Sequence, residues 1–358
     1  MSADTRRPIG LALTALVGIS AGVAGALLAP REFVAAWHPI GLWVFDLSLG
    51  SLVLIWLHDV AGGPWGPAAM PAAQVAGSAL PLGLIAALWL GWAARLELDW
   101  IAHPAPIPEL AVAPEGAVIR SVIYAGVWLG LAAASGAWRS HTTARRPARG
   151  AIALLLHVPL VTLFAMDWLM IMEPHWYSTA AGLRFASGQL VAGIAVIALA
   201  QPLAATRGLG VPSEQHRLDV GTLLLAAVIF WAYVTFMQFL IIWIGDVPEE
   251  ITWYLARSAG GSLGLLAGFV VFKFALPSAL LLSRRIKRNP QTLAATAALV
   301  LLGHAFDLCW QSNLTGDGTV WLRLLLAIAA LAGLGGAWLL LCRIRLDAAR
   351  PTSLERPS

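Results

Sequence analysis

The chain has 358 residues, of which 59% are hydrophobic and only 12% charged, and its mean hydropathy is +0.77. A soluble domain carries roughly 25% charged residues, so this composition excludes a soluble globular class. The two cysteines, Cys309 and Cys342, are too few for a disulfide framework or an iron–sulfur cluster. We therefore interpret the chain as an integral membrane protein.

Apolar runs of about 20 residues, long enough to cross ~30 Å of hydrocarbon, recur along the whole chain. The first run follows Arg6 and Arg7 and lacks a clear small-residue cleavage site, so we expect a retained membrane helix and not a signal peptide. The pattern predicts an all-α membrane protein with ten transmembrane helices, over residues 9–29, 42–59, 72–93, 118–138, 151–172, 182–203, 219–244, 258–282, 291–308 and 319–342.

Basic residues gather in alternate loops. They precede the first predicted helix and follow the fourth, eighth and tenth, at Arg6, Arg7, Arg139, Arg145, Arg146, Arg149, Arg284, Arg285, Lys287, Arg288, Arg343 and Arg345. The loops after the third and seventh helices are acidic. Since Lys and Arg favour cytoplasmic loops, we expect both termini to lie in the cytoplasm. The partner implied by the basic loops is the lipid bilayer, and nothing supports binding to nucleic acid.

Two stretches of the chain resemble each other. Residues 113–150 and 247–290 each begin near a Pro-Glu pair, reach an Arg-Ser pair, cross a run rich in Gly and Ala, and end in an arginine cluster. Asp167 and Asp307 recur at a similar offset. Such a repeat indicates a duplicated unit. We predict one membrane domain, 1–358, with two parallel four-helix bundles, 42–172 and 182–308, and two flanking helices, 9–29 and 319–342.

Ionisable side chains within hydrocarbon are costly, and they usually pair or line a path. One set lies near the acidic face, at Asp46, Arg120, Asp167, Glu173, His175, Arg184, Arg257, His304 and Asp307. A second set lies toward the cytoplasmic side and is a candidate proton path, at His58, Asp59, His157 and Lys273. Structural roles stay open, because Arg120 and Arg257 begin helices and a lone His157 is more often a packing residue.

The sequence carries no motif typical of a bound cofactor. It holds no Cys-x-x-Cys-His motif, which excludes covalent haem. Haem b needs two histidines that face each other across a bundle, whereas His58, His157 and His304 come one per predicted helix. No spacing typical of zinc or another metal occurs. We therefore expect no metal and no redox cofactor in this chain.

Several long segments resemble one family. They are GSLVLIWLHDVAGGPWG, MDWLMIMEPHWYSTAAGLRFASGQ, FWAYVTFMQFLIIWIGDVPEEITWYLAR, LLSRRIKRNPQTL and HAFDLCW, and together they span roughly residues 40–312. This stretch resembles the second quinone-binding subunits of the quinol:cytochrome c oxidoreductase called alternative complex III, which are of the polysulfide-reductase membrane-subunit type. One departure is that the family commonly has a paired histidine where this chain has His58 followed by Asp59.

The resemblance implies a subunit of the bacterial inner membrane without a redox cofactor of its own, with quinone or quinol as a ligand. It implies three protein partners: a sister membrane subunit of the same type, a periplasmic iron–sulfur protein and a multihaem cytochrome c. The family's outward elements fall on Asp167, Trp168, Glu173, Pro174, His175, Trp176, Pro248, Glu249 and Glu250, and its basic loop on residues 287–290. These elements would form a docking surface, a quinone-headgroup pocket or a proton exit.

The candidate residues divide into three roles. Quinone or proton chemistry is expected at Asp167, His175, His304 and Asp307, a headgroup pocket at Trp176, Arg184 and Arg257, and partner docking at Glu173, Asp246, Glu249 and Glu250. The predicted function is a membrane subunit of a respiratory quinol:cytochrome c oxidoreductase that contributes to quinol oxidation, proton translocation or both. Two alternatives stay open: a non-catalytic scaffold for the extramembrane subunits, and a secondary transporter.

Overall fold

The computed structural model describes residues 3–97, 114–138, 146–170, 176, 178–204, 213–316 and 319–348. Every regular element within these residues is a helix, which confirms the predicted all-α class. The elements are α1 (Ala3–Leu28), α2 (Pro30–Ala61), α3 (Gly66–Gly77), α4 (Leu80–Glu97), α5 (Pro114–Ala134), α6 (Pro147–Trp168), α7 (Ala181–Ala204), α8 (Glu214–Gly245), α9 (Pro248–Ala256), α10 (Gly261–Phe269), the π-helical turn η2 (Val270–Ala275), α11 (Leu276–Leu282), α12 (Arg284–Arg288), α13 (Pro290–Gln311), α14 (Val320–Ala330), the π-helical turn η3 (Leu331–Gly335) and α15 (Gly336–Ala348).

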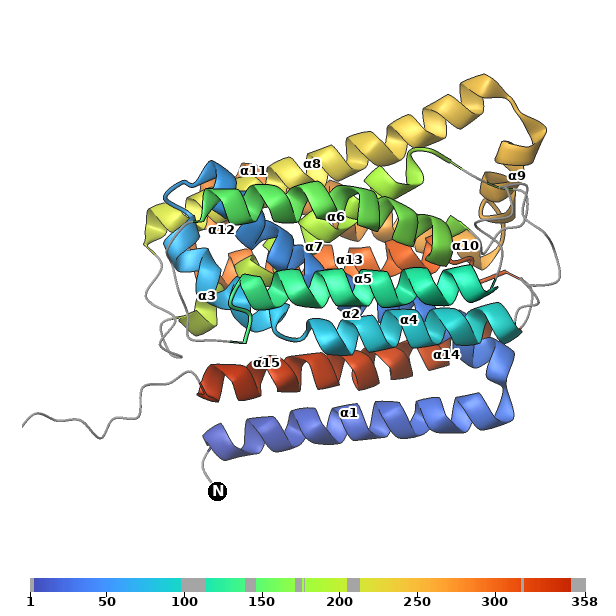
Figure 1. Cartoon of the computed structure of the whole chain (residues 1–358), viewed down its shortest axis with the longest axis horizontal. Coiled ribbons are helices and arrows are strands. Elements are labelled where there is room, and N and C mark those ends of the chain that lie inside the picture. Colours follow the sequence, from blue (N-terminus) through green and yellow to red (C-terminus); the bar gives the residue numbers. More distant parts are fainter. Residues whose placement is uncertain are drawn as a thin grey trace, which may run out of the picture.

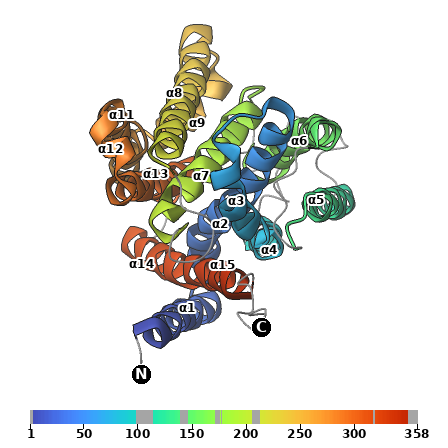
Figure 2. The ribbon, with the colours of Figure 1, turned by 90° about the vertical axis from the view of Figure 1, so that its left-hand side faces the viewer.

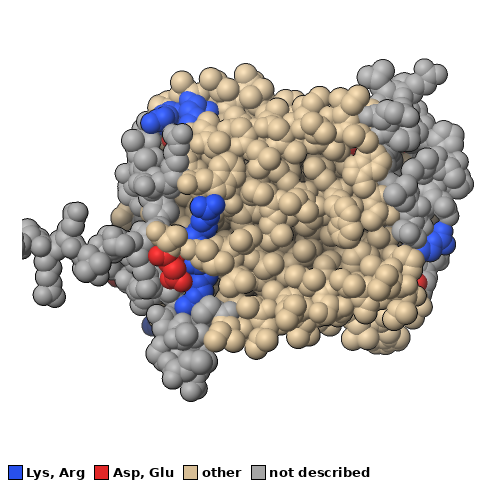
Figure 3. All heavy atoms as spheres, turned by 60° about the horizontal axis from the view of Figure 1, so that its bottom comes forward, with Lys and Arg blue, Asp and Glu red and all other residues tan. Residues whose placement is uncertain are grey.

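The long helices lie roughly along one axis of the molecule (Figure 1). Within the described residues, nine spans are long and apolar enough to cross a membrane, and α3 with α4, bent by 43°, supply a tenth if the pair counts as one span. On the face shown in Figure 3, an uncharged belt separates charged residues at the two ends. These features agree with the predicted multi-pass membrane protein.

Basic side chains gather at one end of the molecule. One end, here called the basic end, holds the start of α6 and the whole of α12, with Arg146, Arg149, Arg284, Arg285, Lys287 and Arg288. The opposite end holds α9, the start of α7 and the end of α13. Successive spans run in opposite directions between these two ends, so the connections between them alternate from one end to the other (Figure 1).

Helix α2 begins at Pro30, twelve residues before the predicted start at 42. The predicted spans, 9–29 and 42–59, leave out residues 30–41, which include Glu32 and Pro39. In the structure Glu32 pairs with Arg323 of α14, which compensates its charge. Pro30 occupies the first turn, where a missing N–H costs nothing. The 32 residues of α2 therefore extend for about 48 Å.

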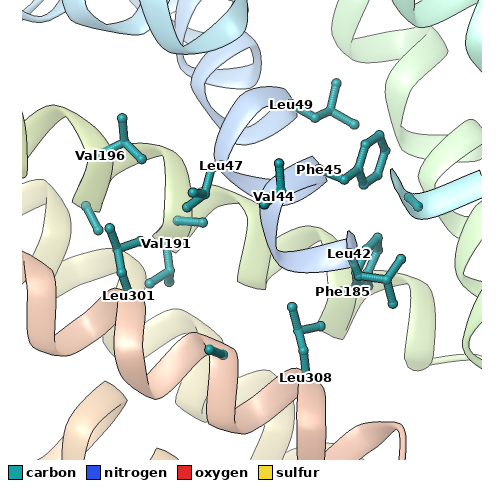
Figure 4. Packing of buried hydrophobic residues seen from close by; sticks show 14 of the residues in the cluster. Leu42, Val44, Phe45, Leu47, Leu49, Phe185, Val191, Val196, Leu301 and Leu308 are labelled. Atoms are coloured by element: carbon teal, nitrogen blue, oxygen red, sulfur yellow. The ribbon is translucent and has the colours of Figure 1, made fainter. Parts of the chain in front are cut away.

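The helices pack as two groups and a flanking pair (Figure 2). Contacts join α2, α4, α5 and α6 in one group. In the other group, α8 contacts α7, η2 and α11, and α13 contacts α7, α10, η2 and α11. Helix α1 packs along α14, η3 and α15, and α14 also contacts α2. The groups meet where α2 packs on α7 and α13, in a core that includes Phe45, Phe185 and Leu308 (Figure 4). Their origin by duplication stays a prediction.

Helices α2 and α7 cross at two glycines. A Cβ added to Gly50 would lie 2.0 Å from the carbonyl oxygen of Gln189, and one added to Gly193 would lie 2.3 Å from the carbonyl oxygen of Gly50. Small residues allow such close approach of membrane helices. The crossing therefore fixes the position of α2 against α7, four residues from Asp46.

Replacing Gly50 with alanine tests this crossing. The added methyl group has no room, so we expect Gly50→Ala to lower the free energy of unfolding by about 1–3 kcal/mol. Thermal unfolding of the purified protein in detergent measures the change. Gly126→Ala is the matched control, because a Cβ there meets nothing within 4 Å. Equal stability of the two variants would contradict the tight crossing.

Candidate functional site

Five ionisable side chains form one buried network where α2, α7, η2 and α13 meet. They are Asp46 of α2, Arg184 of α7, Lys273 of η2, and His304 and Asp307 of α13, and none is more than 2% exposed. Ionisable groups at this degree of burial need partners, since an unpaired charge costs several kcal/mol. The network supplies those partners from within the protein.

Asp307 accepts hydrogen bonds from two cations. Lys273 Nζ donates to one carboxylate oxygen at 2.7 Å, and Arg184 Nη2 donates to the other at 2.7 Å. Gln311 Nε2, one turn further along α13, donates to the second oxygen at 3.2 Å. With Asp46 ionised and His304 neutral, the two cations and two carboxylates of the network balance.

His304 joins Lys273 to Asp46. Its Nδ1 lies 2.9 Å from Lys273 Nζ, and its Nε2 lies 3.0 Å from Asp46 Oδ2. An ammonium group can only donate, so Nδ1 accepts and the ring proton lies on Nε2, which donates to Asp46. A continuous hydrogen-bonded series thus runs from Asp46 through His304, Lys273 and Asp307 to Arg184.

Local backbone features make room for Lys273 and His304. Lys273 lies in the π-helical turn η2, and such turns are frequent at functional sites. A Cβ on Gly303 would lie 2.4 Å from the backbone nitrogen of Lys273, so glycine lets α13 approach η2. A Cβ added to Gly188 of α7 would similarly lie 3.1 Å from Cε1 of the His304 ring. The Lys273 ammonium also lies 3.9 Å from the ring centre of Trp231.

The network begins near the end of the molecule opposite the basic end. Arg184 lies in the first turn of α7 and Asp307 in the last turns of α13, whereas Asp46 lies midway along α2. The sequence grouped Lys273 with residues toward the cytoplasmic side, but the structure places it with His304 and Asp307. The long lysine side chain reaches the Asp307 carboxylate from the middle of its span.

Asp167 belongs to a separate ion pair between α5 and α6. Arg120 Nε and Nη2 donate to its two oxygens at 2.8 and 2.7 Å, and the Tyr124 hydroxyl donates to it at 2.7 Å. The sequence did not indicate Tyr124 as a site residue, although it lies one turn from Arg120 on the same face of α5. Asp167 therefore resembles Asp307 in pairing with a cation, but its partners are different.

The residues of the predicted headgroup pocket gather around Trp253 of α9. Trp176 stacks on that ring with centroids 4.7 Å apart, and the guanidinium groups of Arg257 and Arg184 lie 4.1 and 5.9 Å from its centre. Arg257 also donates to three backbone carbonyls of α9 and the end of α13. The cavity beside Trp176 and Arg184 measures only about 10 Å³, about enough for one water molecule.

The other members of the predicted proton path contact different groups. Asp59 accepts a 2.7 Å hydrogen bond from Arg149 Nε at the start of α6. His58 packs edge-on against the Trp65 ring. His157 lies among tryptophan rings, and its Nδ1 has no hydrogen-bond partner in the described part of the chain. A path through these residues stays a prediction.

Only some of the predicted docking residues lie within the part of the chain that the structure describes. Glu173 and His175 lie outside the described residues, as does the side chain of Glu249. Asp246 ends α8 in a left-handed conformation and is exposed, and Glu250 in α9 is half-buried. Docking at these residues stays a prediction.

His38 is a buried residue that the sequence analysis missed. The predicted spans end at residue 29 and resume at residue 42, whereas His38 lies within α2. It is buried, and neither of its ring nitrogens has a partner among the described residues. Within the described part of the chain, no group of three His, Cys, Asp or Glu side chains is arranged to hold a metal ion.

Comparison of the chain with models of protein families found no match, and neither did comparison with curated proteins. The buried network and the sequence motifs are therefore the basis for inferring a function.

Substitution of Asp307 tests the network as an electrostatic unit. Asp307→Asn keeps the side-chain shape but leaves Lys273 and Arg184 buried without their shared counter-charge. We expect a loss of about 3–5 kcal/mol in the free energy of unfolding, measured by thermal denaturation in detergent. Asp219→Asn is the control, because Asp219 lies outside the network and accepts a hydrogen bond from Gln215 of its own helix, and we expect it to change stability by under about 0.5 kcal/mol. Similar effects of both changes would contradict the ion pairing.

Proposed function

We propose that the chain is a membrane subunit of a respiratory quinol:cytochrome c oxidoreductase and that its buried network moves protons. The observation that carries this proposal is the continuous hydrogen-bonded series from Asp307 to Asp46. Buried ion pairs stabilise a protein no better than well-packed apolar side chains do. A role in moving protons therefore explains such a network better than a contribution to stability does.

The geometry supports a simple proton relay. Lys273 can pass a proton to His304 Nδ1 while His304 Nε2 gives its own proton to Asp46, over hydrogen bonds of 2.9 and 3.0 Å. Lys273 and Asp46 then both become neutral, so the number of protons in the network is unchanged. Arg184 keeps its charge throughout and holds Asp307 in place.

The motifs that resemble alternative complex III suggest what the relay serves. Quinol oxidation releases protons together with electrons, and the network offers a route for the protons. The electrons would pass to the periplasmic iron–sulfur protein and the multihaem cytochrome c, beside a sister membrane subunit. With the basic end in the cytoplasm of a bacterial inner membrane, the Asp307 end of the network faces outward.

Purification of the tagged chain in mild detergent tests the assignment to a complex. We expect subunits with c-type haem and iron–sulfur clusters to copurify, visible in the redox difference spectrum and identified by mass spectrometry. A well-folded, colourless protein isolated alone from native membranes would overturn the assignment. An unrelated membrane protein with the same tag is the control.

Asp46→Asn tests the relay in the purified complex. Asparagine still accepts the hydrogen bond from His304 but cannot take up the proton. We expect quinol-dependent reduction of cytochrome c to fall about a hundredfold with assembly intact. Asp219→Asn, outside the network, should behave as the unmodified protein does. Normal turnover of Asp46→Asn would remove the relay and favour the scaffold role.

A further inference from the structure

Helix α12 is a short basic turn that joins two membrane spans at the basic end of the molecule. Figure 2 views the molecule from that end, and α12 lies at its rim beside α8 and α13. A single residue separates α12 from the span before it, Gly261–Leu282, and a single residue from the span after it, Pro290–Gln311. A turn so close to the ends of two spans lies at the depth of the lipid headgroups.

Two of the four cations of α12 hold the turn against α8. Lys287 is buried over Gly221, where an added Cβ would lie 2.7 Å from its Cγ, and its Nζ donates to Thr222 Oγ1 at 3.1 Å. The carbonyl oxygen of Arg288 accepts a hydrogen bond from Arg217 Nε at 2.6 Å. These contacts fix the position of the turn on the surface of the protein.

The other two cations of α12 face outward. Arg284 and Arg285 are exposed, and neither has a hydrogen-bond or ion-pair partner within the part of the chain that the structure describes. Helix α8 brings two carboxylates to this end: Glu214 pairs with Arg288 at 2.8 Å, and Asp219 accepts a hydrogen bond within α8. Adjacent guanidinium groups repel each other. An anion from outside the chain can supply the charge that compensates them.

An apolar face of the preceding span leads up to these arginines. Ala275, Ala279 and Leu282 are exposed, and their spacing of four and three residues places them on one side of η2 and α11. Leu282 is 72% exposed and precedes Arg284 by two residues. An acyl chain can lie along this face while its headgroup reaches the arginines. The surface therefore matches a molecule with a long apolar tail and an anionic head.

The anion that a bilayer offers at this depth is a phosphate. Guanidinium groups bind phosphate oxygens through charge-assisted hydrogen bonds, often two at a time. A zwitterionic lipid carries its own cation beside the phosphate, and that cation competes with the arginines. An anionic phospholipid has no such competitor. A nucleic acid or an acidic protein fits less well, because the two arginines follow directly on a membrane span.

We propose that α12 binds the phosphate of an anionic phospholipid through Arg284 and Arg285, with an acyl chain against the exposed face of η2 and α11. Lys287 and Arg288 position the turn and do not contact the lipid phosphate. The site does not rest on the proposed function, because it shares no residue with the buried network. It is compatible with a redox subunit, a scaffold and a transporter alike.

Native mass spectrometry of the full chain, delipidated in detergent, tests the site. Dioleoylphosphatidylglycerol is the probe, and dioleoylphosphatidylcholine is the zwitterionic comparison with the same acyl chains. We expect phosphatidylglycerol to bind about tenfold more tightly than phosphatidylcholine. A cation near an anionic headgroup contributes about fivefold to the affinity, so Arg284→Gln and Arg285→Gln should each weaken binding of phosphatidylglycerol about fivefold, and the double variant about 25-fold.

A second double variant separates this site from the general charge of the basic end. Arg146 precedes α6 and Arg345 lies near the end of α15, and both are exposed. Arg146→Gln with Arg345→Gln removes the same charge and should keep the affinity for phosphatidylglycerol within about twofold. Equal losses in the two double variants would overturn the site, and so would equal binding of the two lipids by the unmodified chain. Displacement of phosphatidylglycerol by excess inorganic phosphate would overturn it in favour of a site for free phosphate.

Discussion

The pairing of Asp307 with Lys273 and Arg184 governs the arrangement of the second helix group. One carboxylate neutralises cations from α7 and η2, and His304, one turn away on the same helix, extends the contact to α2. Because an uncompensated charge at this depth is costly, these helices must keep their register. Gly303, Gly188 and the crossing at Gly50 let the backbones come close enough for the side chains to meet.

The two resembling halves differ in how their aspartates pair with cations. In the first group, Asp167 is held by Arg120 and Tyr124, and this arrangement ends at one ion pair. In the second group, Arg257 turns to backbone carbonyls, and cations from two other helices take its place beside Asp307. The second arrangement therefore extends inward to His304 and Asp46, which makes it the one suited to proton movement.

Bilayer thickness sets the length of each apolar run, and so the spans could be predicted from the sequence. His304, Asp307 and Arg184 could be selected because ionisable residues are rare in such runs. The start of α2 could not be predicted from the sequence, because it depends on the ion pair of Glu32 with Arg323, which lies near the other end of the chain. The place of Lys273 depends on a π-helical turn, and the contacts that hold α12 to α8 are a property of tertiary packing alone.

The inclination of the network along the helix axes has an electrical consequence. His304 lies about 5 Å deeper along α13 than Asp307, one helical turn within a hydrocarbon layer of ~30 Å. In the proposed relay, a proton that moves inward through the network crosses part of the membrane voltage, for which a full crossing is worth about 2.3 kcal/mol per 100 mV. The proposed relay would then make the occupancy of Asp46 by a proton depend on the membrane voltage as well as on pH.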